Sequence, residues 1–265
     1  MDLSAIYRYP IKSARGHSLD AAVVDRFGVS GDRRWMFIDS AGQFCSQRCT
    51  PQMALLDVVS TDSGLRLSFA GDSIELETPG EQHREVPATV WGHSMPAHIA
   101  DAPVNAWLSE HLGGDLRLVF CPADASRPVD PAYLPSSKLE QHVGFADGFP
   151  LLIISQASLD DLNTRLPVPV PMDRFRPNLV IRGTVPYAED GWRKLRVGST
   201  TLAIVKPCSR CAIPSIDQQT AERDPAINRM LASYRRRDGV IYFGMNAIVT
   251  VGAGFAVGDS VEVLE

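Results

Sequence analysis

The sequence predicts a mainly β protein with some α structure, built from two β-barrel-like domains. Short apolar or alternating runs, separated by Gly, Asp and Ser, recur in both halves of the 265-residue chain. Helical periodicity is confined to a few stretches. A segment rich in Pro, Ala and Ser, residues 122–137, has no periodicity and is interpreted as a loop. We therefore expect a first domain at residues 1–120 and a second at residues 121–265.

The first domain is expected to hold several short strands and one helix. The strand-like runs are AAVVDRF (21–27), RRWMFID (33–39), ALLDVVST (54–61), GLRLSFA (64–70) and SIELETP (73–79). A helix is predicted in PVNAWLSEHLGG (103–114), where Val104, Trp107, Leu108 and His111 share one face before a Gly pair. We interpret this helix as a hinge between the two units.

The second domain is predicted to be mixed but mainly β. The apolar run FPLLIISQ (149–156) indicates a strand, and SLDDLNTRL (158–166) indicates a helix with Ser158 as its N-cap and acids in its first turn. A second helix is expected in RDPAINRMLASYRRR (223–237). The remaining runs are strand-like: PNLVIRG (177–183), KLRVGSTTLAIVKP (194–207), VIYFGMNAIVTVG (240–252) and FAVGDSVEVLE (255–265).

Charge and hydropathy exclude several classes of protein. The net charge of −5 provides no overall basic field, so we expect no nucleic-acid partner, although a local anion pocket is possible. No window approaches 18 uninterrupted apolar residues, and the N-terminus has no apolar core of signal-peptide length. We therefore expect a cytoplasmic protein without a membrane partner.

The five cysteines do not suggest a disulfide framework, because their number is odd and no secretory signal accompanies them. Cys208 and Cys211 have the Cys-x-x-Cys spacing that suits a metal or a redox thiol, and the spacing alone leaves both open. A zinc site would need further ligands, and Cys45 and Cys49 lie in the other predicted domain. Plain structural thiols are the third alternative.

Six segments together resemble the MOSC superfamily, specifically proteins that join an N-terminal MOSC-type β-barrel domain to a MOSC domain, such as the amidoxime-reducing components. These segments are YPIKSARG (9–16), GDRRWMFID (31–39), FADGFPLLIISQASLDDLNTRL (145–166), FRPNLVI (175–181), KPCSRCAIPSID (206–217) and VGDSVEVL (257–264). The resemblance covers nearly the whole chain. It implies a molybdenum cofactor (Mo-molybdopterin) between the two domains.

The resemblance also implies which residues hold that cofactor. Cys211 matches the family's molybdenum ligand, and a thiolate beside a cation such as Arg210 suits this role. The donors for the anionic cofactor are Lys12, Ser13, Arg33, Arg176, Asn178, Ser209 and Arg210. Asp147 aligns with a cofactor-contacting acid and is a second candidate catalytic residue.

Two local patterns bear on these donors. Arg33 and Arg34 are adjacent in a strand-like run, so only one of them should face the pocket; the matching favours Arg33. Arg176 precedes Pro177 and is expected to be extended. Gly148, Phe149 and Pro214 depart from the family's usual residues.

The implied activity is reduction of a small-molecule N-hydroxylated or N-oxygenated substrate. The chain ends at VEVLE without the ferredoxin-like extension of some relatives, so a separate electron-donor protein, of ferredoxin or flavin reductase type, is expected. The cluster RRRD (235–238) is interpreted as a solvated helix end, with docking of an acidic donor as the alternative. The competing functions are a molybdenum-cofactor carrier, a persulfide sulfur carrier that uses Cys211, and a scaffold that has lost its ligand.

Overall fold

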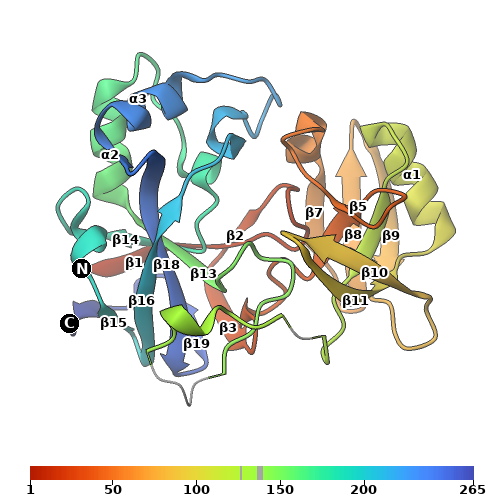
Figure 1. Cartoon of the computed structure of the whole chain (residues 1–265), viewed down its shortest axis with the longest axis horizontal. Helices are drawn as coiled ribbons and strands as arrows, with labels where there is room; N and C mark the ends of the chain where they lie inside the picture. The colour runs from red at the N-terminus through yellow and green to blue at the C-terminus, as the bar shows by residue number, and fades with distance from the viewer. Residues whose placement is uncertain (126, 136–139) are drawn as a thin grey trace.

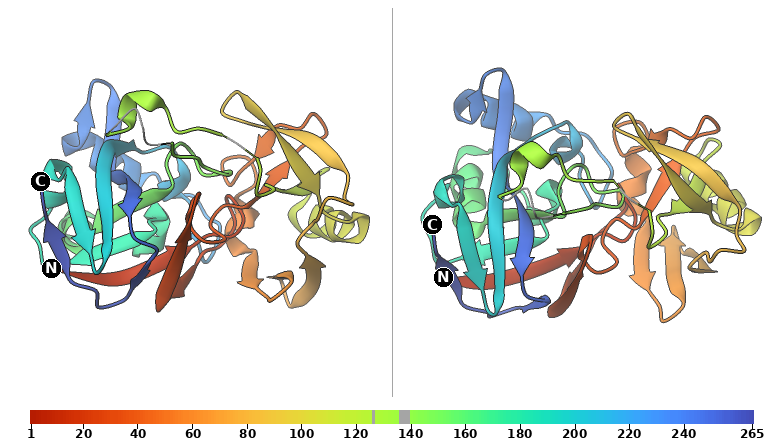
Figure 2. Two further views of the ribbon diagram at one scale, coloured as in Figure 1. Left: turned by 90° about the horizontal axis from the view of Figure 1, so that it is seen from below. Right: turned by 60° about the horizontal axis from the view of Figure 1, so that its bottom comes forward.

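The computed structural model describes residues 1–125, 127–135 and 140–265 and shows two lobes side by side (Figure 1). The predicted loop at 122–137 falls partly outside these residues; its described part contains a short 3-10 helix, Pro131–Tyr133. The fold is mainly β, as predicted. Both chain ends lie on the large lobe, and two further views show the same two lobes from other directions (Figure 2).

The large lobe is built on one curved sheet whose strand order is β2-β1-β14-β13-β18-β16-β15-β20, with β17 attached to β18. Its first two strands come from the start of the chain, so β1 pairs with β14 across most of the sequence. A small sheet of β19, β3 and β4 closes one side. The bounds are β1 Asp2–Arg8, β2 His17–Leu19, β3 Ala21–Asp25, β4 Gly28–Val29, β13 Leu151–Ser155, β14 Leu179–Arg182, β15 Lys194–Val197, β16 Thr200–Ser209, β17 Arg236–Arg237, β18 Val240–Val251, β19 Gly254–Ala256 and β20 Val261–Val263.

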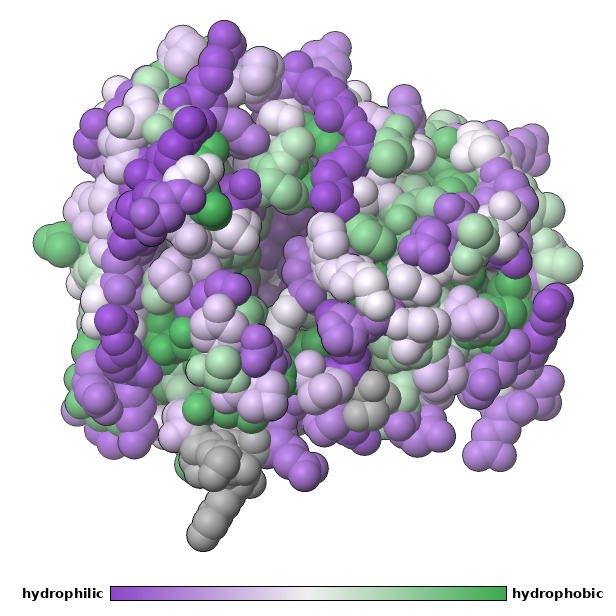
Figure 3. All heavy atoms as spheres, viewed as in Figure 1, coloured by the Kyte–Doolittle hydropathy of each residue, from purple (hydrophilic) through white to green (hydrophobic). Residues whose placement is uncertain are grey.

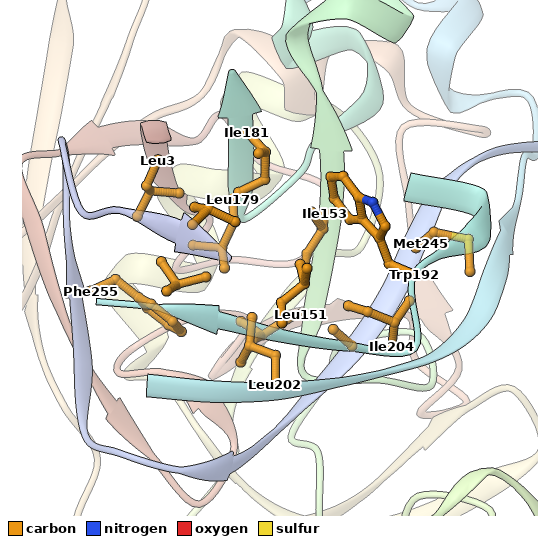
Figure 4. Packing of buried hydrophobic residues seen from close by; sticks show 14 of the residues in the cluster. Leu3, Leu151, Ile153, Leu179, Ile181, Trp192, Leu202, Ile204, Met245 and Phe255 are labelled. Atoms are coloured by element: carbon orange, nitrogen blue, oxygen red, sulfur yellow. The ribbon is translucent and has the colours of Figure 1, made fainter. Parts of the chain in front are cut away.

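Alternation along the strands of the large sheet fills two cores. Ile153 packs into the interior of the curved sheet, where Leu3, Leu179 and Leu202 also lie (Figure 4). Its neighbour Ile154 points to the opposite face and packs with residues of α2 (Gln156–Arg165) and α3 (Ala226–Tyr234). Successive side chains of a strand point to opposite faces, so these apolar runs make strands that are buried on both sides.

The described part of the small lobe contains two sheets, one α-helix and a short 3-10 helix, Pro51–Leu55. The sheet order is β10-β11-β12-β5-β6 for the first and β7-β8-β9 for the second. Along β5, Trp35 and Phe37 enter one core while Met36 and Ile38 enter another. The bounds are β5 Trp35–Ile38, β6 Phe44–Cys45, β7 Asp57–Ser60, β8 Gly64–Phe69, β9 Asp72–Glu77, β10 Glu85–Val90, β11 His93–Ile99, α1 Ala102–Leu112 and β12 Arg117–Phe120.

The helix predicted at 103–114 is present as α1, with Val104 and Leu108 buried in the small lobe. It is not a hinge: β12 follows it and pairs with β5, so the chain leaves the small lobe only after Phe120. The division of the chain into domains at residue 120 stays a prediction.

One expectation about a helix end was wrong, and another held only in part. The helix in 158–166 begins earlier, at Gln156, because the Ser155 hydroxyl accepts from the Ser158 backbone N–H at 3.1 Å and is the N-cap. The basic cluster 235–238 begins at a helix end, since Arg235 is the C-cap of α3. The two residues that follow are not part of that end, because Arg236 and Arg237 form β17 and pair with β18 in a hairpin.

Candidate functional site

A cavity of about 440 Å³ lies between the two lobes, and the surface is visibly hollowed there (Figure 3). All of the site residues predicted from the sequence line it: Lys12, Ser13, Arg33, Asp147, Arg176, Asn178, Ser209, Arg210 and Cys211. They come from the turn after β1, the turn before β5, the loop before β13, the turn before β14, and the end of β16 with the turn that follows it. The structure thus brings together residues that are almost 200 positions apart, while their roles stay predictions.

The lining is strongly basic, although the protein carries a net charge of −5. Among the described residues, six basic side chains and one carboxylate, that of Asp147, line the cavity. Such a local excess of cations attracts anions even on an acidic protein. The basic residues are Lys12, Arg33, Arg48, Arg176, Lys206 and Arg210.

Two of these arginines are organised around one buried ring. The guanidinium carbons of Arg33 and Arg176 lie 4.4 and 4.2 Å from the centre of the Tyr9 ring, which is 1% exposed. Arg33 donates to the Asn178 side-chain oxygen at 2.9 Å, and Arg176 donates to the Ala14 carbonyl at 2.7 Å. We call Tyr9, Arg33, Arg176 and Asn178 the Tyr9 cluster. An aromatic face between cations offsets their repulsion, so the two guanidinium groups are held ready for an anion.

The two arginines of this cluster differ in their electrostatic partners. Burial lowers the pKa of Arg33, but its ion pair with Asp32, together with Tyr9 and Asp147, outweighs burial and raises that pKa. Arg176 makes no ion pair among the described residues, and burial lowers its pKa to about 10, so it stays charged at neutral pH. A charged guanidinium without a carboxylate is the natural partner of a bound anion.

The prediction that Arg33 rather than Arg34 faces the cavity agrees with the lining, but the reason is not strand alternation. Arg33 precedes β5 and has a φ of 46°, whereas the Arg34 guanidinium lies over the Phe27 and Phe120 rings. The expectation of an extended Arg176 was wrong. Pro177 bars the right-handed helical region for Arg176, and the chain takes the left-handed one at φ 57° to turn from a 3-10 helix, Met172–Phe175, into β14.

Strained backbone concentrates at this cavity. Of the eight non-glycine residues with positive φ in the described chain, four line the cavity: Ser13, Arg33, Trp91 and Arg176. Each such residue costs on the order of 1–3 kcal/mol and persists only where the surroundings enforce it. This concentration marks the cavity as a functional site on geometric grounds.

Lys12 and Asp147 form an ion pair across the lobes. The Lys12 ammonium is buried and also donates to the Phe145 carbonyl at 2.8 Å. Removal from bulk water raises the pKa of Asp147, but Lys12 and a hydrogen bond from the Trp91 indole at 3.0 Å outweigh it and hold that pKa well below its ordinary value. Asp147 is therefore ionised at neutral pH and accepts hydrogen bonds.

The two cysteines at the end of β16 have different surroundings. Cys208 is half-buried and accepts from the Arg210 guanidinium at 3.2 Å; burial raises its pKa, and Arg210 only partly offsets this. Cys211 is exposed in the cavity wall. The Arg210 Nε is buried and has no hydrogen-bond partner among the described residues. Cys211 is thus the accessible thiol of the pair.

Sequence reasoning missed three lining residues that form a second cluster. The Arg48 guanidinium lies over the Trp91 ring at 4.8 Å and over the Phe44 ring at 5.4 Å. We call Phe44, Arg48 and Trp91 the Trp91 cluster. No periodicity or motif marks these positions, whereas Lys206, also missed, stands in the KPCSRC segment and could have been found there.

No group of three or more His, Cys, Asp or Glu side chains suited to a metal ion occurs among the described residues. A Cys208–Cys211 zinc site therefore gains no further ligands in this part of the chain. No helix in the described ranges is long and apolar enough to cross a membrane.

Comparisons with known proteins show the family to which the chain is similar. Residues 1–115 match the MOSC N-terminal beta barrel domain, and residues 140–262 match the MOSC domain. The chain is 31% identical over 246 residues to mitochondrial amidoxime reducing component 2 of Bos taurus, covering 89% of this chain and 73% of that protein. Mitochondrial amidoxime-reducing component 1 of Homo sapiens is 30% identical over 250 residues, covering 89% and 72%.

A larger protein also matches. The molybdenum cofactor sulfurase of Oryza sativa subsp. japonica is 32% identical over 266 residues, which is 92% of this chain. The chain spans only 32% of the length of that sulfurase.

Proposed function

This chain belongs to the family that joins a MOSC N-terminal β-barrel domain to a MOSC domain, and we propose that it is an oxidoreductase that binds the molybdenum cofactor and reduces N-hydroxylated compounds. The observation that carries the proposal is the exposed Cys211 thiol at a cavity lined by six basic side chains and one carboxylate. The names of the amidoxime-reducing relatives supply the substrate class.

The residues fit the cofactor on their own chemistry. Arg176 has no carboxylate partner among the described residues, and the buried Arg210 Nε has no hydrogen-bond acceptor, so both leave donors free for an anionic ligand. Cys211 offers a soft sulfur ligand for the metal. A redox-inert scaffold would need neither the unpaired donors nor the accessible thiol.

We assign the holding of the phosphate to Lys12, Ser13, Arg33 and Arg176, and the remaining contacts to Ser209 and Arg210. Asn178 acts through Arg33, since its side-chain oxygen accepts from Arg33 and from the Leu152 backbone while its nitrogen donates to the Tyr7 carbonyl. It is therefore a positioning residue.

When bound, the cofactor supplies a redox-active metal for cleavage of the N–O bond. The reaction consumes two electrons and two protons and releases water with the reduced nitrogen compound. Ionised Asp147 would accept hydrogen bonds from the bound cofactor and would not donate a proton near neutral pH. The protons therefore come from water, and the electrons come from a separate donor protein of ferredoxin or flavin reductase type.

The test is to produce the protein in a host that makes the cofactor and to measure molybdenum, pterin and reduction of an amidoxime by a chemical reductant. Cys211→Ser should lower turnover by more than about 100-fold, since even partners behind a metal ligand change activity 10- to 100-fold. Cys49→Ser, the matched change at the other exposed cysteine, should not. Well-folded wild-type protein without molybdenum and pterin would overturn the proposal.

A second readout needs no turnover. Cys211 and Cys49 are both exposed, whereas burial raises the pKa of Cys45 to about 11. Loading with the cofactor should slow alkylation of Cys211 by at least about 10-fold, because a metal-bound thiolate is not free to react. Alkylation of Cys49 should stay unchanged.

The rival function is a sulfur or cofactor carrier, which the match to a molybdenum cofactor sulfurase favours. A carrier that uses Cys211 as a persulfide would gain the mass of one sulfur atom at this residue and show no amidoxime reduction. A cofactor carrier would bind molybdenum and pterin and transfer them to an acceptor enzyme without reducing amidoximes.

A further inference from the structure

Arg48 is a cation in the cavity wall without an anionic partner. Its guanidinium lies over the Trp91 and Phe44 rings, and its side chain donates only to the Ser46 hydroxyl, at 3.3 Å. No carboxylate lies within ion-pair distance of it among the described residues. The nearby Asp147 carboxylate is already bound by Lys12 and by the Trp91 indole.

The lack of an ion pair does not by itself distinguish Arg48. Arg66, Arg182 and Arg196 each pair with a carboxylate, whereas Arg26, Arg84 and Arg229 are exposed and have no ion pair among the described residues. What distinguishes Arg48 is its place in the cavity wall. Arg48 is half-buried at the cavity, where a charge without a partner is less well hydrated and less well screened. A guanidinium in this position, stacked on aromatic rings, suits bidentate recognition of a carboxylate.

Trp91 supports the same conclusion from the backbone. It occupies the tip of the β10–β11 hairpin with a φ of 51°, followed by Gly92 at 81°, in a two-residue turn where Asn-Gly is the favoured pair. Its indole is 47% exposed, yet the hydrogen bond to Asp147 fixes its orientation. A large, exposed aromatic residue that lines a cavity and has a strained backbone is typical of a ligand-binding wall.

We propose that Arg48, held on the rings of Trp91 and Phe44, is a specificity-determining residue that binds a carboxylate on the N-hydroxylated substrate. The inference rests on the proposed function and adds the substrate class: planar N-hydroxylated compounds that carry an anionic group. The indole offers a flat surface for the planar part, and Arg48 binds the charge.

The test compares kcat/KM for benzamidoxime and for its para-carboxylate derivative in the cofactor-loaded protein. Arg48→Gln should lower the preference for the carboxylate compound by about 10- to 100-fold, the size expected for a charge-assisted hydrogen bond. Arg48→Lys keeps the positive charge but loses the planar guanidinium that binds a carboxylate through two hydrogen bonds, so it should retain part of the preference. Arg66→Gln, at an arginine of the small lobe far from the cavity lining, is the control and should leave the preference unchanged.

A binding measurement separates this inference from the proposed function. Titration of the cofactor-loaded protein with benzoate and with benzamide should show that Arg48→Gln weakens benzoate binding by about 10-fold or more relative to benzamide. Arg48-dependent benzoate binding without any amidoxime reduction would overturn the reductase function and leave the carboxylate site standing. Reduction of both amidoximes with an unchanged preference in Arg48→Gln would overturn the carboxylate site alone.

Loss of pterin from Arg48→Gln would also overturn the inference, because the anion at Arg48 would then be the phosphate of the cofactor. Retention of pterin at the wild-type level is the expected result, since the Tyr9 cluster, Lys12 and Ser13 are assigned to that phosphate.

Discussion

The Tyr9 cluster and the Trp91 cluster place guanidinium groups over aromatic rings in the same cavity, but they are built differently. Tyr9 is 1% exposed, and each of its two arginines also donates a hydrogen bond to a protein oxygen. Trp91 is 47% exposed, and Arg48 has a single hydroxyl partner. Arginines that are fixed by hydrogen bonds to the protein suit an anion that stays bound. An arginine that has few hydrogen bonds and lies on an exposed ring suits an anion that exchanges.

The largest expected effect comes from removing the unpaired cation of the Tyr9 cluster. Arg176→Met should reduce bound pterin by about 10-fold or more, because a charge-assisted contact to phosphate is lost. Arg48→Gln, the corresponding change in the Trp91 cluster, should retain the wild-type content. The measurement is the amount of pterin per chain after gel filtration. Equal losses of pterin in the two variants would contradict the prediction that only the Tyr9 cluster holds the cofactor.

A second change, at Gly16, tests whether the ring of the Tyr9 cluster is held rigidly. A Cβ at Gly16 would lie 2.2 Å from the Tyr9 ring, and the ring cannot move without displacing both arginines. We expect Gly16→Ala to lower the free energy of unfolding by about 2–3 kcal/mol and to reduce cofactor loading. Gly191→Ala, where a Cβ meets nothing within 4 Å, is the matched control for urea unfolding. A Gly16→Ala protein of normal stability would show that the ring is free to shift.

Asp147 links the two sides of the cavity, because it forms an ion pair with Lys12 and accepts a hydrogen bond from the indole of the Trp91 cluster. Asp147→Asn should lower the free energy of unfolding by about 1–2 kcal/mol at pH 7, since buried Lys12 loses its charge partner; the figure is discounted because the carboxylate is 76% exposed.

The pH dependence of this effect follows from the sign of the pKa shift. The pKa of Asp147 is held below its ordinary value, so its contribution is present above about pH 4 and is lost as the pH falls further, through the lowered value. The stability difference between wild type and Asp147→Asn should therefore be constant from pH 7 to about pH 5 and shrink below about pH 4. A difference that vanishes already above pH 5 would contradict the ion pair.

The smallest effect is expected at the Tyr9 hydroxyl, which is buried without a hydrogen-bond partner in the described chain. Tyr9→Phe keeps the ring under both arginines and removes an unsatisfied polar group. The free energy of unfolding should stay the same or rise by no more than about 1 kcal/mol, and the cofactor content should not change. Tyr9→Leu, which removes the ring, should lose cofactor. A loss in Tyr9→Phe as large as in Tyr9→Leu would mean that the hydroxyl, not the ring, holds the site.

The fold class and the lining of the cavity could be predicted because both depend on local sequence patterns. Alternation and turn residues marked strands such as β8 and β13, and the contiguous segments around Lys12, Arg176 and Cys211 carried the site. Strand β1 was missed, because its partner β14 lies almost 180 residues away and no local pattern reports that pairing.

The Trp91 cluster could not be predicted for a similar reason. Arg48 follows a polar stretch without periodicity, and its position depends on a ring from a hairpin formed much later in the chain. The left-handed backbone of Arg176 was missed because the rule for residues before proline excludes one conformation without choosing among the others.

The pairing of β1 with β14 has a consequence for how the protein is made. During translation Asp2 emerges before its sheet partner Arg182, which follows only after the small lobe has left the ribosome. The small lobe can fold in the meantime, whereas the edge of β1 must wait, and contacts between such distant residues form slowly. Because the cavity wall includes the turns after β1 and the end of β16, the site closes only once most of the chain has been synthesised. We therefore expect cofactor capture to be a late event, available to nearly finished chains and not to nascent ones.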